Sequence, residues 1–316
     1  MAAVAFVELD ERLVKKSSLE AISYASAVDA EVTAVVMGAI DESELAKIGA
    51  AGANKVLHAT DEKLNQPNIM AYSSALAEAM DTTGAKILVM AKSSIADPIS
   101  ARVSVKVGAG LVSNVVSLPD LSDGFVVNRS IYTGKAFAQT KVSSEKVVLT
   151  LKKNAVPIKE DGAAPTVEAF SPAHSEADFA IKVTSQEKAE GDILLTEADI
   201  VVSGGRGLKG PENWGIVEDL AKSLGAATGC SKPVSDMDWR PHHEHVGQTG
   251  VKVSPSLYVA VGISGAIQHL AGVNSSKYIL VVNKDEEAPF FKAADYGIVG
   301  DAFEILPKLT EAIKGS

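Results

Sequence analysis

The sequence contains little cysteine and no long apolar run. Cys230 is the single cysteine among 316 residues, so the chain cannot form an internal disulfide, and one thiol cannot hold a metal cluster. A membrane-spanning helix needs roughly 18 to 20 apolar residues in a row, whereas runs such as residues 279–282 have the length of a strand. The chain opens on an apolar run without a positively charged leader. These absences predict a cytoplasmic protein in which any redox chemistry depends on a bound cofactor.

Basic residues are too few for a nucleic-acid binder. The formal net charge is -10, from 40 acidic and 30 basic side chains, and acids exceed bases in both halves of the chain. A polyanion is held mainly by Lys and Arg contacts to its phosphates, so nucleic acid is excluded as a partner. Hydrophobic residues make up 46% of the chain, as in folded proteins. At this length we expect two domains, each with its own core.

The first half of the chain alternates short β-branched runs with amphipathic segments, which is typical of an α/β domain. Strands are expected at residues 4–7, 31–37, 55–58 and 86–91, and helices near residues 15–27, 43–51, 68–80 and 96–107. Three further strands, without helices between them, are expected at residues 125–129, 136–142 and 146–151. The sequence therefore predicts an N-terminal parallel sheet with an antiparallel extension.

The pattern is interrupted between residues 154 and 192, where Pro, Gly, Ser and charged residues break up the apolar periods. Beyond this segment the chain is richer in glycine. We therefore expect an N-terminal domain at residues 1–187 and a C-terminal domain at residues 188–316.

The second domain opens with an apolar strand that runs into a glycine turn. Gly205, Gly207 and Gly210 satisfy the dinucleotide pattern G-x-G-x-x-G. The match is weak, because Pro211 follows the third glycine and no acid stands about 20 residues later to hold a ribose. A phosphate-binding turn and an ordinary glycine-rich strand-to-helix turn both remain open here.

Further strands of this domain also end in polar, glycine-containing segments. Such ends follow the apolar runs at residues 258–261, 278–282 and 296–299, and a C-terminal helix is expected at about residues 302–313. In an open parallel sheet these ends converge on the crevice where ligands bind. The pattern predicts a Rossmann- or flavodoxin-like parallel sheet that holds a large cofactor, although each polar residue alone could be a helix cap or a turn former.

Several motifs together resemble the alpha subunit of electron transfer flavoprotein, of the bacterial type. They are the runs VGQTG (246–250), VGISGAIQHLAG (261–272) and NKD to AP (283–289), with a fainter likeness at NRSIYTG (128–134). The resemblance implies a heterodimer with an electron transfer flavoprotein beta subunit, with one FAD held in the second domain. It implies a redox carrier rather than an enzyme, which takes electrons from flavin dehydrogenases and passes them on singly. No direct insertion into a membrane is expected.

The resemblance also implies which residues contact FAD. They are Arg206, Ser231, Lys232, Val246, Gly247, Gln248, Thr249, Ser264, Gly265, Ala266, Ile267, Gln268, His269, Asn283 and Asp301. Among these, Thr249 would lie near the flavin N5, His269 near the C2 carbonyl and Lys232 beside the ring, where all three would tune the flavin. The family usually has Arg at the position of Lys232, and an ammonium on a flexible stem orients differently from a planar guanidinium.

Other interpretations compete at single residues and for the whole chain. The run 242–245 (HHEH) could ligate zinc but lacks further ligands, so no metal site is expected. Taken alone, His269 is expected to be a half-buried histidine at the start of a helix. Cys230 is expected to be a small buried side chain that fills space in the core. The first domain offers no phosphate-sized glycine turn and is expected to dock the beta subunit, with Arg102 at the interface. The alternatives for the chain are an NAD(P)-dependent dehydrogenase that uses the Gly205 turn and a non-catalytic assembly subunit.

Overall fold

The computed structural model describes residues 2–134, 136–181, 183–184, 194–196 and 198–315. The chain divides into two compact units, Met1–Gln186 (unit 1) and Glu187–Ser316 (unit 2). The domain boundary expected between residues 187 and 188 lies outside the described residues.

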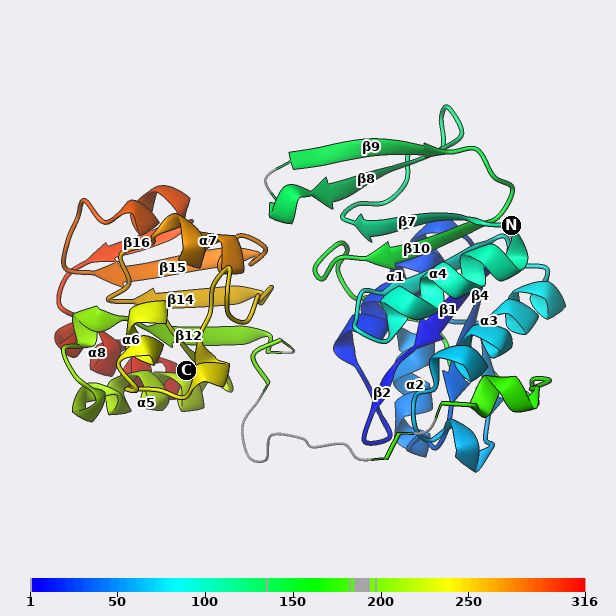
Figure 1. Ribbon diagram of the computed structural model, residues 1–316, viewed down its shortest axis with the longest axis horizontal. Helices are drawn as coiled ribbons and strands as arrows, with labels where there is room; N and C mark the ends of the chain where they lie inside the picture. Colours follow the sequence, from blue (N-terminus) through cyan, green and yellow to red (C-terminus); the bar gives the residue numbers. More distant parts are fainter. Residues whose placement is uncertain (1, 135, 182, 185–193, 197, 316) are drawn as a thin grey trace. The chain divides into compact units, whose positions relative to one another are not determined.

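Unit 1 is built on one nine-stranded sheet in the order β11-β5-β4-β1-β6-β10-β7-β8-β9. The strands are β1 (Ala2–Val7), β4 (Glu31–Met37), β5 (Lys55–Ala59), β6 (Ile87–Ala91), β7 (Gly110–Val115), β8 (Phe125–Ile131), β9 (Ala136–Val142), β10 (Val147–Leu151) and β11 (Thr166–Ala169). Neighbours from β11 to β7 are parallel, and β8 and β9 continue the sheet as antiparallel strands at one edge (Figure 1). The predicted parallel sheet with an antiparallel extension is confirmed.

Helices cover both faces of this sheet. They are α1 (Lys16–Val28), α2 (Glu42–Ala50), α3 (Ile69–Thr83) and α4 (Ala96–Val107), and a short hairpin, β2 (Leu9–Asp10) with β3 (Leu13–Val14), follows β1. One core forms between the sheet and α1 and α2, around Ile22 and Ile48, and a second forms against α3 and α4, around Leu76 and Ile99. Since β1 is covered on both faces, its sequence AAVAFV is apolar throughout.

Two details of unit 1 differ from the sequence-based expectation. The strand expected at residues 146–151 is β10, which lies between β6 and β7 in the parallel part of the sheet and not in the extension. The interrupted segment after residue 154 contributes β11, which pairs with β5 at the opposite edge. An edge strand is held by backbone hydrogen bonds along one side, and the side chains of β11 are all exposed, so no apolar pattern marks it.

Unit 2 contains a five-stranded parallel sheet in the order β13-β12-β14-β15-β16. The strands are β12 (Ile200–Gly204), β13 (Ala227–Cys230), β14 (Leu257–Val261), β15 (Tyr278–Asn283) and β16 (Tyr296–Val299). The helices are α5 (Gly215–Leu224), α6 (Lys232–Asp236), α7 (Ile267–Val273) and α8 (Ala302–Lys314). Numbered from β12, this order is the flavodoxin-like 2-1-3-4-5, so the predicted fold of this part is confirmed.

The two faces of this sheet carry different covers. Helices α5 and α8 pack on one face around Leu220 and Leu306, together with Trp214, while Tyr258, Val273 and Phe290 form the core on the other. From β12 the chain runs to β13 on one side of it, and from β14 the chain runs to β15 on the other side. The carboxyl ends of β12 and β14 therefore form the topological switch point of the fold. Within the described part of the chain, no helix has both the length and the apolar character needed to cross a bilayer.

Candidate functional site

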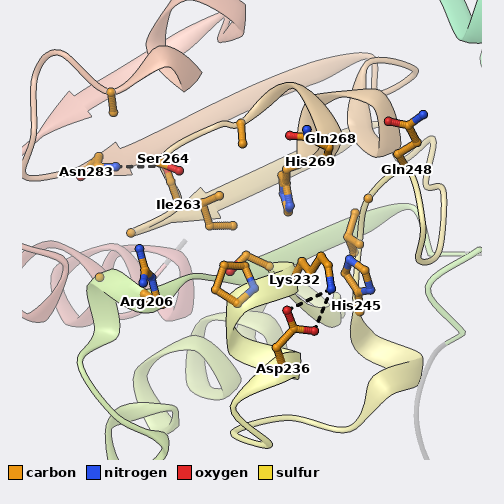
Figure 2. Close-up of a pocket in the computed structure, with 18 of the residues that line it drawn as sticks. Arg206, Lys232, Asp236, His245, Gln248, Ile263, Ser264, Gln268, His269 and Asn283 are labelled. Atoms are coloured by element: carbon orange, nitrogen blue, oxygen red, sulfur yellow. Dashed lines mark hydrogen bonds and ion pairs between the residues drawn. The ribbon is translucent and has the colours of Figure 1, made fainter.

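A cavity of about 550 Å³ opens at the carboxyl ends of the unit 2 strands, at the switch point (Figure 2). Its walls come from the segments that follow β12, β13, β14 and β15 and from α6 and α7. It is lined by Arg206, Gly207, Ser231, Lys232, Pro233, Asp236, His245, Val246, Gly247, Gln248, Thr249, Gly262, Ile263, Ser264, Ala266, Gln268, His269, Asn283, Asp285 and Ala288. The strand ends therefore converge as the sequence predicted.

The glycine amides of the turn after β12 are used in packing against the turn after β14. The Gly205 amide donates to the Val261 carbonyl at 2.9 Å, and the Gly207 amide donates to the Gly262 carbonyl at 3.0 Å. A Cβ on Gly205 would lie 2.2 Å from the Gly262 oxygen, so the two turns approach each other backbone to backbone. Because these amides are already bonded, they cannot cradle a pyrophosphate. The dinucleotide interpretation of G-x-G-x-x-G loses its physical basis, and the ordinary strand-to-helix turn is correct.

Helix α6 brings two opposite charges to the cavity wall. Ser231 precedes the helix, and Pro233 lies in its first turn, where a missing amide hydrogen costs nothing. The Lys232 ammonium donates to both carboxylate oxygens of Asp236, at 2.9 and 3.0 Å, as Figure 2 shows. Lys232 thus lies at the cavity as predicted, but it shares a salt bridge with the acid one helical turn later.

The segment 245–250 forms another wall. His245 pairs with Cys230 at the end of β13, and the Gln248 amide donates to the Gln268 carbonyl at 2.7 Å. Burial is the main reason why the pKa of His245 is lowered; the neighbouring His242 and the Lys232 ammonium add to the effect, and Asp236 opposes it. Cys230 itself is fully buried, and burial raises the pKa of its thiol to about 12. It is a filler without nucleophilic character at neutral pH, as expected.

His269 is buried at the start of α7, 6% exposed, with its ring between β14 and the cavity. Its Nε2 lies 2.8 Å from the hydroxyl of the fully buried Tyr258, and Phe290 packs against its edge. Its Nδ1 is buried, and the Val246 backbone carbonyl lies close enough to favour the protonated ring. Burial lowers the pKa of His269 to about 4; His245 adds to the effect and the Val246 carbonyl opposes it. The ring is therefore neutral at physiological pH.

Asn283 connects two strand ends. Its side-chain amide donates to the Ile263 carbonyl at 3.0 Å, and its oxygen accepts from the Asp285 amide at 3.1 Å. The turns after β14 and β15 are thereby held in register, with Ser264 and Asp285 at the cavity.

Three residues expected to contact FAD do not line this cavity. Gly265 is buried with φ +82°, where a Cβ would meet Phe290, so it serves the turn. Ile267 is 71% exposed at the first position of α7. Asp301 caps α8 by accepting from the Phe303 amide at 3.0 Å and pairs with Lys284 at 3.6 Å.

Sequence reasoning missed Asp236, His245 and Asp285. An acid four residues after Lys232 is a readable signal for a helical ion pair, once α6 is recognised as a helix. The sequence suggests only one role for His245, as part of a possible zinc site in the run 242–245. Among the described residues, no group of three or more His, Cys, Asp or Glu side chains could hold a metal ion.

Comparison with known proteins places the chain in a family. The profile of the electron transfer flavoprotein domain matches residues 3–175, and that of the electron transfer flavoprotein FAD-binding domain matches residues 194–274. Electron transfer flavoprotein subunit alpha of Mycobacterium leprae is 39% identical over 99% of this chain and 98% of its own length. The chain belongs to the electron transfer flavoprotein alpha-subunit family. Proteins of the same name are 42% identical in Paracoccus denitrificans, over 89% of each chain, and 34% identical in Bacillus subtilis, over 97% of this chain.

The residues at the cavity fit the FAD of this family. Arg206 is an exposed cation at the wall with no ion pair to the described residues, as a phosphate ligand requires. The exposed side chains of Gln248, Thr249 and Ser264 offer hydrogen-bond donors and acceptors at the cavity wall. Small residues such as Gly247 and Ala266 let a large ligand approach the backbone.

Proposed function

We propose that this chain is the FAD-carrying subunit of a heterodimeric electron carrier that works in the cytoplasm. Bound FAD would take electrons from flavin dehydrogenases and release them singly to a further acceptor. The partner would be an electron transfer flavoprotein beta subunit. The observation that carries this proposal is the match of residues 194–274 to the FAD-binding domain, together with the cavity at the switch point that those strands form.

We propose that the same residues expected from the sequence hold FAD. Arg206 would bind a phosphate, and the Thr249 hydroxyl would offer a hydrogen bond to the ring edge. His269, neutral and backed by Tyr258, would present a dipole rather than a full charge. The proposed set is Arg206, Ser231, Lys232, Val246, Gly247, Gln248, Thr249, Ser264, Gly265, Ala266, Ile267, Gln268, His269, Asn283 and Asp301.

We propose that unit 1 docks the beta subunit and binds no nucleotide. Large apolar side chains are exposed on its antiparallel extension, among them Phe137 on β9 at 66% and Tyr132 after β8 at 78%. Such residues are enriched at interfaces. Arg102 on α4 would add a charged contact, whose loss should alter the rate and orientation of docking.

A second cavity lies in unit 1, beside the carboxyl end of β1, with a volume of about 430 Å³. Its polar groups already have protein partners. Glu8 pairs with Lys15 at 2.7 Å, the Asn65 oxygen accepts from the Ala39 amide, and the Tyr72 hydroxyl donates to a backbone carbonyl. This supports a unit 1 without a nucleotide.

The test is to purify the chain together with its beta subunit and record the visible spectrum. A flavin spectrum is expected, with FAD released on denaturation and identified by chromatography at one per unit 2. Release of NAD or of FMN in place of FAD, or a colourless complex, would overturn the proposal. NAD would point to a dehydrogenase, and a colourless complex to an assembly subunit.

A further inference from the structure

Helix α6 is unusual among the cavity walls because it presents a cation and an anion side by side. Lys232 and Asp236 both line the cavity, with side chains 57% and 52% exposed. Residues four apart lie on the same face of a helix. The bidentate contact of the ammonium with both carboxylate oxygens directs the Lys232 side chain along α6. The pair therefore meets a cavity ligand as a dipole and not as a free positive charge.

The surrounding charges leave this pair as a self-contained unit. The nearby acid Glu244 is engaged by Arg240 at 2.6 and 2.9 Å. The other charged residues that line the cavity, Arg206 and Asp285, belong to the turns after β12 and β15. Two imidazoles, His245 and His269, face the same cavity, and burial lowers the pKa of each. Neither of them replaces the charge that Asp236 neutralises.

We propose that Asp236 is a positioning residue that holds Lys232 and reduces the positive charge felt by the cavity ligand. The proposal rests on FAD being that ligand. The salt bridge holds the Lys232 ammonium along α6. Because Coulomb attraction weakens with distance, an ammonium released from Asp236 and free to approach the ligand would attract its negative charge more strongly. Adding an electron to the ligand makes it more negative, so the strength of this pair acts directly on the first-electron potential.

The test is Asp236→Asn in the purified heterodimer, with the first-electron potential measured by spectroelectrochemical titration. Asn keeps the size of the side chain and removes its charge. Because the pair is exposed and screened, we expect the first-electron equilibrium to shift by about 1.4- to 5-fold toward reduction. For a one-electron couple this is a rise of about 10 to 40 mV.

Three further variants separate the proposed role from general effects. Asp219→Asn on α5 changes the net charge of unit 2 equally, away from the cavity, and should leave the potential unchanged. Lys232→Met should lower the potential, and in that background Asp236→Asn should lose most of its effect. Asp236→Glu should restore a potential close to that of the parent chain. The shift should also shrink at high salt, because the pair is exposed.

The outcomes are distinguishable from a failure of the proposed function. If the parent heterodimer contains no FAD, the proposed function fails. If the parent holds FAD but Asp236→Asn leaves the potential unchanged or lowers it, only the role of Asp236 is overturned. An Asp236→Asn effect of equal size with and without Lys232 would also overturn it, since Asp236 would then act alone. Because potential and affinity are linked, the affinity of the heterodimer for one-electron-reduced FAD should rise relative to its affinity for oxidised FAD by the same factor.

Discussion

His269 should make the stability of unit 2 depend on pH in a defined window. Its pKa in the fold is about 4, against an ordinary value of about 6.5 for an unfolded chain. Between these values the unfolded chain binds a proton that the folded chain does not. Stability is therefore fully present above about pH 6.5 and is lost as the pH falls toward 4. From pH 7 to pH 4.5 the loss due to this residue is about 2 to 3 kcal/mol.

The assay is urea unfolding of the chain at several pH values, followed by tryptophan fluorescence. Both tryptophans, Trp214 and Trp239, belong to unit 2, so the signal reports that unit. His269→Gln removes the titration, and its stability should fall less steeply over the same range. The comparison uses the difference between the two proteins, because His245 and acidic groups titrate in both. Equal losses, within about 0.5 kcal/mol, would mean that the ring is not buried in its neutral form.

Two other substitutions test the packing of the two units. Glu20 of unit 1 is buried, and its carboxylate accepts hydrogen bonds from the backbone amides of residues 154–156. Glu20→Gln should lower the free energy of unfolding by about 1 to 3 kcal/mol, because the glutamine side chain has one acceptor oxygen for these three donors. Hydrogen exchange should show faster exchange at residues 154–156 in that variant, and unchanged exchange there would contradict this assignment. Gly205→Ala should destabilise unit 2 and abolish FAD binding, because its Cβ would overlap the Gly262 carbonyl. The matched change Gly215→Ala, with open space around the Cβ, should leave thermal unfolding unchanged or raise its midpoint.

Sequence patterns predicted the helices and strands of unit 1 wherever the alternation of apolar and polar side chains follows which of them are buried. The helix expected at residues 96–107 has those limits in the structure, because an amphipathic period precedes Gly108, which ends it with a left-handed φ of +66°. Strand β7 escaped prediction, since its sequence GLVSNV mixes polar and apolar residues and Asn114 has φ +60°. Its pairing with β10 depends on a partner more than 30 residues away, which local periodicity does not contain.

For the candidate site, the general rule for strand ends located the cavity, and the family resemblance named residues within it. Neither of them predicted which partners the backbone amides and charged side chains of the site would bond to. The glycine pattern around Gly205 looks the same whether its amides face a ligand or a neighbouring turn. Only the structure shows that they bond to Val261 and Gly262. Likewise, the sequence predicts a full positive charge at Lys232, because the salt bridge with Asp236 becomes visible only when both are placed on helix α6.

The balance of charge at the cavity follows from these contacts. Lys232 is neutralised within α6 by Asp236, and His269 is neutral because it is buried. Among the described residues that line the cavity, Arg206 is then the cation without an acidic partner. It lies at the turn after β12, whereas Lys232 and His269 belong to the walls formed by α6 and α7. Arg206, at the turn after β12, and Asp285, after β15, are thus the charged side chains at the cavity that no ion pair among the described residues offsets. Because a dipole stabilises added negative charge less than a free cation does, we expect the proposed tuning of the flavin to depend on how strongly Asp236 holds Lys232.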